Sequence, residues 1–117
     1  MAVFRAGQIV LADWRDALPK EANKRRPAVV VEDDGLFAPD YPAVVLVPIT
    51  EDGDLAIPEL SVRLEPTAEN GCSKPCYAVS HFVTATAAVR VRPTASRVTG
   101  DELARIRRQI AFAVGLG

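Results

Sequence analysis

The sequence holds few of the residues on which several common kinds of active site depend. Its 117 residues include one histidine, one methionine, one tryptophan and two cysteines, and there is no HExxH, GxSxG or Walker-type motif. A metalloprotease, an α/β-hydrolase and a P-loop nucleotide hydrolase are therefore excluded, and no Ser-His-Asp constellation is plausible. We expect phosphate chemistry without a metal or cofactor.

An excess of charge of either sign is also missing. The chain has 14 Lys and Arg residues against 15 Asp and Glu residues, for a formal net charge of -1. This balance excludes a polybasic protein that holds nucleic acid through its overall field. Any site for an anionic ligand has to be local.

Long apolar runs are absent as well. A run such as residues 43–47 is far shorter than a membrane span, and the first residues lack an apolar stretch of signal-peptide length. We therefore expect a cytoplasmic protein with no membrane partner. Cys72 and Cys76 are too few for a disulfide framework, and only His81 could add to them in a zinc site. We expect two reduced or incidental thiols and no metal.

Length and composition indicate one folded domain over residues 1–117, because 49% hydrophobic and 25% charged residues are ordinary for a globular protein. Hydrophobic patterning predicts six short strands over residues 8–12, 27–31, 43–49, 60–64, 77–84 and 89–92. The strand at 43–49 is apolar enough to be buried on both faces. In the next strand, Ser61 and Arg63 should face solvent.

Only the end of the chain has a helical pattern. Thr99 and Glu102 fit a capping box. An apolar stripe follows at helical spacing, formed by Leu103, Ile106, Ile110 and Val114. Three arginines should project away from the sheet: Arg105, Arg107 and Arg108. The prediction is a mostly β chain, a small and mainly antiparallel barrel, with a C-terminal α-helix.

Basic side chains gather where a long polar loop meets the second predicted strand. Lys20, Lys24, Arg25 and Arg26 stand there against one acid, Glu21. A strand orients an arginine, and the planar guanidinium matches the oxygens of a phosphate, which makes Arg26 the best-anchored residue of an anion site. The alternative is a set of solvated loop charges.

Three further side chains each have a functional and a structural interpretation. Thr50 ends the most apolar strand, where its hydroxyl can donate to a phosphate oxygen or bind the local backbone. Trp14 can stack on a base or pack at the rim of the core. His81 can act as an acid or base near neutral pH, or be a packed, hydrogen-bonded side chain.

Three segments, by order and spacing, resemble the MazF/PemK family of bacterial toxins. They are residues 7–13 (GQIVLAD), 24–31 (KRRPAVVV) and 48–50 (PIT). The family pattern is an apolar strand ending in Asp, a charged loop, an Arg-Pro, a valine-rich strand and a later strand ending in Thr. The likeness covers nearly the whole chain.

This resemblance implies an SH3-like small β-barrel, the fold of CcdB and MazF plasmid maintenance toxins. It implies the toxin of a type II toxin-antitoxin system in the bacterial cytoplasm, a homodimer that cleaves single-stranded RNA, arrests growth and binds a cognate antitoxin. Attack of a ribose 2′-hydroxyl would give a cyclic phosphate and a 5′-hydroxyl end. The implied catalytic pair is Arg26 and Thr50, and the implied RNA-binding residues are Trp14, Lys20, Glu21, Lys24, Arg25 and His81.

The late strand departs from the family pattern. Many relatives have an acidic-Gln-Ile-Arg-Thr segment where this chain has residues 80–84 (SHFVT), which lack the acid and the arginine. His81 stands in the place of the Gln, so we expect it to contact RNA or assist proton transfer.

Two other functions are alternatives to a ribonuclease. A CcdB-like toxin of the same fold acts on DNA gyrase through its helix, yet the tail at residues 113–117 has no Trp. A barrel without activity would serve as an interaction module. The pairing of Arg26 with Thr50 favours the ribonuclease.

Overall fold

The computed structural model describes residues 4–14 and 25–116, and in this part of the chain the prediction of a mostly β protein with a C-terminal helix is confirmed. The strands are β1 (Gln8–Asp13), β2 (Arg25–Val30), β3 (Ala43–Thr50), β4 (Ser61–Leu64), β5 (Cys76–Val79), β6 (Thr84–Ala87) and β7 (Val91–Arg97). Short 3-10 turns are η2 (Gly53–Leu55), η3 (Pro58–Leu60), η4 (Ser80–Phe82) and η5 (Ala88–Arg90), and the helix is α1 (Gly100–Ala113).

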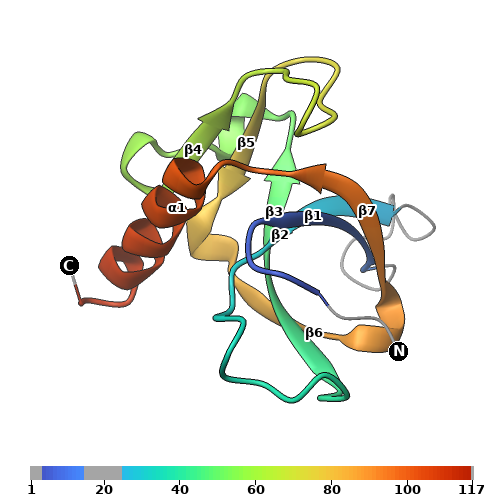
Figure 1. Cartoon of the computed structure of the whole chain (residues 1–117). Helices are drawn as coiled ribbons and strands as arrows, with labels where there is room; N and C mark the ends of the chain where they lie inside the picture. The colour runs from blue at the N-terminus through green and yellow to red at the C-terminus, as the bar shows by residue number, and fades with distance from the viewer. Residues whose placement is uncertain (1–3, 15–24, 117) are drawn as a thin grey trace.

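Strand β3 is the centre of the sheet. The strand order is β4-β5-β3-β2-β1-β7, and β6 pairs with β3 outside this path. One edge of β3 pairs with β2, whereas the other edge is shared, with β6 on its first half and β5 on its last residues. Figure 1 shows β3 running the length of the molecule, with α1 on the side of β4 and β5.

Buried side chains form two apolar cores on opposite faces of β3. Val47 and Ile49 belong to the core that includes Ile106 of α1. Val44 and Leu46 belong to the other core, together with side chains from β1, β2 and β7. Successive side chains of a strand point to opposite faces, so one strand supplies both cores. The expected burial of residues 43–49 on both faces is confirmed.

Helix α1 begins as the capping box predicts. The Thr99 hydroxyl accepts the N–H of Glu102 at 3.0 Å, and the Glu102 carboxylate accepts the N–H of Thr99 at 2.8 Å. Ile106 is fully buried, with Leu103 and Ile110 packed against the same core. In the part of the chain that the structure describes, no helix is long and apolar enough to cross a membrane.

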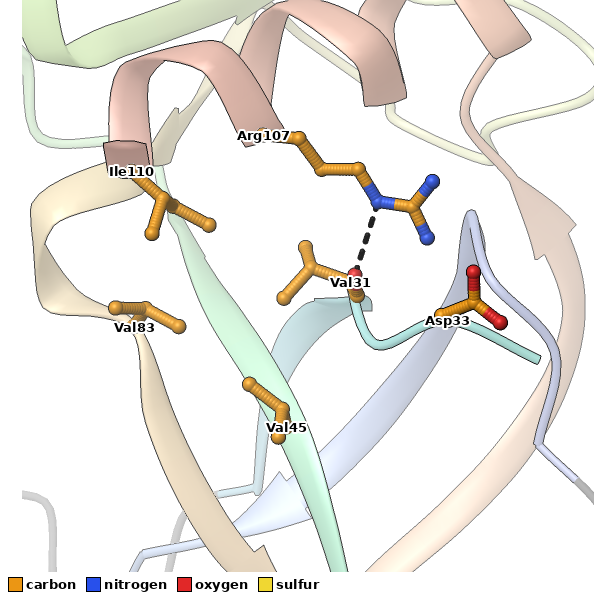
Figure 2. A pocket seen from close by; sticks show the side chains of 6 residues that line it. All are labelled: Val31, Asp33, Val45, Val83, Arg107 and Ile110. Carbon is orange, nitrogen blue, oxygen red and sulfur yellow. Dashed lines mark hydrogen bonds between the residues drawn. The ribbon is translucent and has the colours of Figure 1, made fainter. Parts of the chain in front are cut away.

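Two predictions for the helix were wrong. The helix ends at Ala113, so Val114 lies beyond the buried stripe and is exposed. Arg107 does not project away, because its guanidinium donates to the carbonyl oxygen of Val31 at 3.0 Å (Figure 2). It also donates to the carbonyl oxygen of Glu32 at 3.0 Å. These carbonyls lie just past the end of β2, where the strand ladder no longer supplies every partner.

The strand predicted over residues 77–84 is interrupted. Ala78 of β5 pairs with Ile49, and Thr84 of β6 pairs with Leu46. Residues 79–83 therefore span a stretch of β3 that has only residues 47 and 48, so they are too many to continue the ladder. The surplus chain leaves the sheet as η4 and packs against α1. The predicted strand is therefore divided in two, β5 and β6, which pair with different parts of β3. No local sequence pattern predicts this division.

Ser61 was expected to face solvent and is instead buried. Its hydroxyl donates to the carbonyl of Ile57 at 2.7 Å. Its own carbonyl accepts from the amide of Gln109 at 2.9 Å, and Gln109 in turn accepts from the Ser80 hydroxyl at 2.6 Å. These bonds join α1 to β4 and η4.

The strand predicted to stop before Pro93 runs on instead. Strand β7 begins at Val91 and continues through Pro93 to Arg97, while the preceding residues form η5. It stands at the end of the strand order, where a proline's missing N–H can face away from the sheet.

Candidate functional site

Arg26 and Thr50 meet at one end of the sheet. Strands β2 and β3 are antiparallel, with Ala28 opposite Pro48. Continuing this register by two residues brings Arg26 opposite Thr50. Both side chains line one surface hollow of about 440 Å³, here named the Arg26–Thr50 hollow. The other residues that line it are Arg25, Pro27, Ile49, Glu51, Asp52 and Cys76.

The two predicted catalytic residues are both less exposed than Arg25, their basic neighbour. Arg26 and Thr50 are each partly buried, whereas Arg25 is exposed at the rim. Their strands supply side chains to both cores, such as Val29 of β2 to the first and Leu46 of β3 to the second. Both functional groups are therefore attached to the rigid part of the molecule, as precise positioning of a reacting group requires.

The Thr50 hydroxyl can serve the local backbone and a ligand at once. Its oxygen accepts the N–H of Asp52 at 3.0 Å, which fixes the turn after β3. A hydroxyl has one proton to donate besides its acceptor lone pairs. The local bond thus orients the oxygen, and the proton can be given to an anion in the hollow.

The acids of the hollow each have a positive or N–H partner of their own. Glu51 pairs with Lys74 at 3.2 Å, and the Asp52 carboxylate accepts the N–H of Asp54 at 2.9 Å. These partners offset part of the negative charge beside Arg25 and Arg26. An anion entering the hollow meets two guanidinium groups and a hydroxyl.

Tyr77 also lies beside the hollow, a place that its sequence pattern does not predict. The register of β3 and β5 places Tyr77 opposite Thr50. The Tyr77 hydroxyl accepts from Arg63 at 3.0 Å, and the Arg63 guanidinium lies 5.8 Å from the centre of the tyrosine ring. Arg63 also pairs with Glu65, which raises the pKa of Arg63. No signal in the sequence pairs β5 with the end of β3.

The two cysteines are free thiols, one of which lines the hollow. Cys76 is buried and donates to the carbonyl of Lys74 at 3.2 Å. Burial, and then the neighbouring Cys76, raises the pKa of Cys72 to about 11, so Cys72 stays protonated at neutral pH. Among the residues that the structure describes, no three His, Cys, Asp or Glu side chains are grouped to hold a metal ion.

Trp14 lies at the edge of the second core. It packs against that core, and its indole N–H donates to the Thr86 hydroxyl of β6 at 2.9 Å. This geometry agrees with the structural interpretation of Trp14, packing at the rim of the core. A role in stacking on a base stays a prediction. Lys20, Glu21 and Lys24 lie outside the described residues.

His81 does not line the Arg26–Thr50 hollow. It belongs to η4, which contacts α1, and its ring lies edge-on to Phe82 with centroids 4.7 Å apart. Its Nδ1 atom is buried without a hydrogen-bond partner. The structure therefore does not bring His81 together with Arg26 and Thr50, and its role in RNA contact stays a prediction.

A different surface lies under the second half of α1. A hollow of about 390 Å³, here named the α1 hollow, is lined by Val31, Asp33, Val45, Val83, Arg107 and Ile110 (Figure 2). Four of these side chains are aliphatic, and Arg107 closes one side by its bond to Val31. This lining favours apolar contact over acid-base chemistry.

Comparison with known proteins gives a family and a fold. The family model for the PemK-like, MazF-like toxin of type II toxin-antitoxin systems matches residues 5–114. No curated protein sequence matches the chain.

The crystal structure of MazF from Deinococcus radiodurans is 20% identical, with a TM-score of 0.76 over 98% of this chain and 99% of that one. A MazE-MazF complex from the same organism is 18% identical, with a TM-score of 0.71 over 100% of both chains. An endoribonuclease from a mycobacterial species, in complex with its cognate antitoxin, is 16% identical, with a TM-score of 0.74 over 98% of both chains.

These structures share the fold of this chain, and the family model spans nearly all of it, including the strands that carry Arg26 and Thr50. The chain therefore belongs to the family of PemK-like, MazF-like toxins of type II toxin-antitoxin systems.

Proposed function

We propose that this toxin is a metal-independent endoribonuclease that cleaves single-stranded RNA, such as mRNA, in the bacterial cytoplasm and so arrests growth. The observation that carries the proposal is the meeting of Arg26 and Thr50 in one hollow. The two residues are far apart in sequence, and each is a donor suited to phosphate oxygens. The same two positions are the catalytic pair that the family resemblance implies.

In the proposed reaction the ribose 2′-hydroxyl attacks the adjacent phosphorus. The bond from phosphorus to the 5′-oxygen breaks, which leaves a cyclic phosphate and a 5′-hydroxyl end. Arg26 stabilises the extra negative charge of the phosphorane and is a donor for the leaving oxygen, while Thr50 holds a non-bridging oxygen. A guanidinium is a hydrogen-bond donor without an acceptor, so Arg26 is not the base that takes the 2′-proton. That proton passes to water, and water supplies the proton that the leaving 5′-oxygen takes up.

The test is cleavage of a labelled single-stranded RNA in EDTA by the wild type and by Arg26→Ala, Thr50→Val and Thr50→Ser. We expect Arg26→Ala and Thr50→Val each to lower the rate by a factor of about 100 to 1,000, the usual cost of one donor to a developing oxyanion. Thr50→Ser keeps the hydroxyl and should keep most of the activity. Arg105→Ala is the control, because Arg105 is an exposed arginine on α1.

Intact RNA after incubation with wild-type protein would contradict the proposal, as would full activity in both Arg26→Ala and Thr50→Val. Growth arrest without RNA cleavage would instead favour the gyrase-binding alternative.

We also propose a homodimer formed through the α1 hollow. A symmetric contact needs one surface that is complementary to itself. This face offers an apolar hollow, and the residues that follow α1 include the exposed Val114 and Leu116, at 64% and 78% exposure. In sedimentation velocity, Val114→Asp with Leu116→Asp should shift the protein from dimer to monomer. Val89→Asp, at an exposed valine on η5, should leave it dimeric.

The proposed partner of this toxin is an antitoxin encoded beside it. Two of the structural neighbours are MazE-MazF and toxin-antitoxin complexes, which supports this proposal. An acidic, extended antitoxin segment that folds on binding would suit the arginines of the Arg26–Thr50 hollow. A short reading frame directly upstream that encodes an acidic tail is the expected observation.

A further inference from the structure

A second charged hollow adjoins the Arg26–Thr50 hollow. It measures about 340 Å³ and is here named the arginine hollow. The residues that line it are Asp13, Arg25, Val89, Arg90 and Arg92. They come from β1 and β2 near the start of the chain and from η5 and the start of β7 near its end.

The register of three neighbouring strands explains this cluster. Asp13 of β1 pairs with Arg25 of β2, and Leu11 of β1 pairs with Arg92 of β7. Asp13 and Leu11 are two residues apart on one strand, so their side chains share a face. Directly paired residues also share a face, which places Arg25 and Arg92 on the same side of the sheet.

Arg25 connects the two hollows, because it lines both. Strands β7, β1, β2 and β3 are consecutive in the sheet. Neighbouring strands lie about 4.8 Å apart, so β7 is roughly 10 Å from β2. Arg25 and Arg92 face the side of the sheet opposite to Arg26 and Thr50, so one extended nucleic-acid strand reaches both hollows by passing around the start of β2 at Arg25.

The charge of the arginine hollow is strongly local. The described residues of its lining supply three guanidinium groups and one carboxylate, in a chain whose net charge is -1. Arg90 and Arg92 are exposed, and a guanidinium fork matches two phosphate oxygens. Among the residues that the structure describes, the lining contains no aromatic side chain on which a base could stack, so the chemistry favours the phosphate backbone over the bases.

We propose that the arginine hollow is a backbone subsite, which holds a phosphate of the same RNA strand whose scissile phosphate lies between Arg26 and Thr50. The proposal rests on the proposed ribonuclease function and extends it. Arg25 and Arg92 contact the flanking backbone without reading sequence. This subsite lengthens the RNA that the enzyme binds, and it does not take part in the chemical step.

The test compares short and extended RNA that cannot be cleaved, because a 2′-deoxy nucleotide replaces the attacking ribose. One oligonucleotide ends beside the scissile phosphate, and two others extend it by several nucleotides on the 5′ or the 3′ side. Fluorescence anisotropy gives the Kd of each for the wild type, Arg92→Ala and Arg92→Lys at several salt concentrations. Arg97→Ala is the matched control, since Arg97 is an exposed arginine on the same strand outside the hollow.

We expect Arg92→Ala to weaken binding of one of the two extended RNAs by about three- to tenfold and to leave the short RNA unchanged. The slope of log K against log salt for that RNA should become shallower by about 0.7, the value of one phosphate contact on a single strand. Arg92→Lys should fall between the wild type and Arg92→Ala. Arg97→Ala should match the wild type.

Equal Kd values and salt slopes for the wild type and Arg92→Ala on every RNA would overturn the subsite. So would an equal loss on short and extended RNA. Cleavage of all-ribose RNA by the wild type is measured in parallel. Failure of the ribonuclease proposal appears there, whereas failure of the subsite appears only in the dependence of Kd on RNA length.

Discussion

The two ends of β2 present opposite surfaces. At its start, Arg25 and Arg26 line a charged hollow together with Thr50. Just past its end, Val31 lines the α1 hollow, together with aliphatic side chains such as Val45 and Ile110. Between these ends both faces of the strand are buried in the two cores. A short, rigid strand can therefore hold donors for an anion at one end and an apolar contact surface at the other.

This difference separates activity from stability. The charged end is lined mainly by charged and polar side chains, whereas the apolar end adjoins the core under α1. Burial of apolar area is the main favourable contribution to folding. Changes near α1 should therefore alter the free energy of unfolding, and changes at the charged end should alter RNA cleavage and binding.

The largest effect on stability is expected from Ile106→Ala. Ile106 is fully buried on the side of α1 that faces the core. Truncation of such a side chain lowers the free energy of unfolding by about 2 to 5 kcal/mol, through lost burial and the cavity left behind. Urea unfolding followed by circular dichroism measures this loss, with Arg105→Ala as an exposed control on the same helix. Under conditions where the variant is folded, its cleavage rate should equal that of the wild type. A slower rate in fully folded Ile106→Ala would break the proposed separation.

A smaller effect is expected from Arg107→Met. This change keeps most of the length of the side chain but removes the hydrogen bonds to the carbonyls of Val31 and Glu32. The free energy of unfolding should fall by about 1 kcal/mol. RNA affinity should stay the same although a cation is lost, because Arg107 lies at the apolar end. If Arg107→Met weakened RNA binding as much as Arg92→Ala, the contrast between the two ends would be wrong.

The smallest effect concerns Cys72, which lies near the charged end and should have a thiol of low reactivity. Its pKa is raised from 9.0 to about 11 by burial and by Cys76. Iodoacetamide at pH 8 should therefore alkylate Cys72 much more slowly in the folded protein than in urea, as read by peptide mass spectrometry. Equal rates in the two states would contradict the raised pKa.

The raised pKa of Cys72 also makes the free energy of unfolding depend on pH. Between pH 9.0 and about 11 the unfolded thiol loses its proton while the folded thiol keeps it. Ionisation then favours the unfolded state, so this contribution to stability is present below pH 9.0 and is lost as pH rises towards 11. Stability of Cys72→Ser should accordingly fall less steeply over this interval than that of the wild type.

Local chemistry made part of the structure predictable. Thr99 and Glu102 cap α1 as expected, because a capping box involves residues within one turn of each other. The alternation of apolar residues also identified most strands. Arg107 was expected to project away from the sheet and instead bonds to it, because its acceptors lie on a segment about 75 residues away in the chain. Helical spacing predicts the helix face from which a side chain starts, but it does not predict which distant backbone groups a long side chain such as that of Arg107 can reach.

The candidate site divides in the same way. Arg26 and Thr50 were identified from motifs, and the arginine hollow and Tyr77 were not. The signal for Tyr77 would have been its register with Thr50, and the signal for Arg92 its register with Leu11. Both registers depend on which strands become neighbours. His81 shows the converse, since its place in the motif did not predict that the chain would turn away at η4.

By itself, the sequence determined a mostly β fold with a capped C-terminal helix, a family and a pair of candidate catalytic residues. It could do so because hydrophobic period, capping and motif spacing are properties of short segments. Only the tertiary structure decided that Arg26 lies opposite Thr50, that Arg25 belongs to two adjoining hollows, and that His81 lies elsewhere. Strand order and register arise when distant segments bury their apolar faces together, and that choice depends on the whole chain at once.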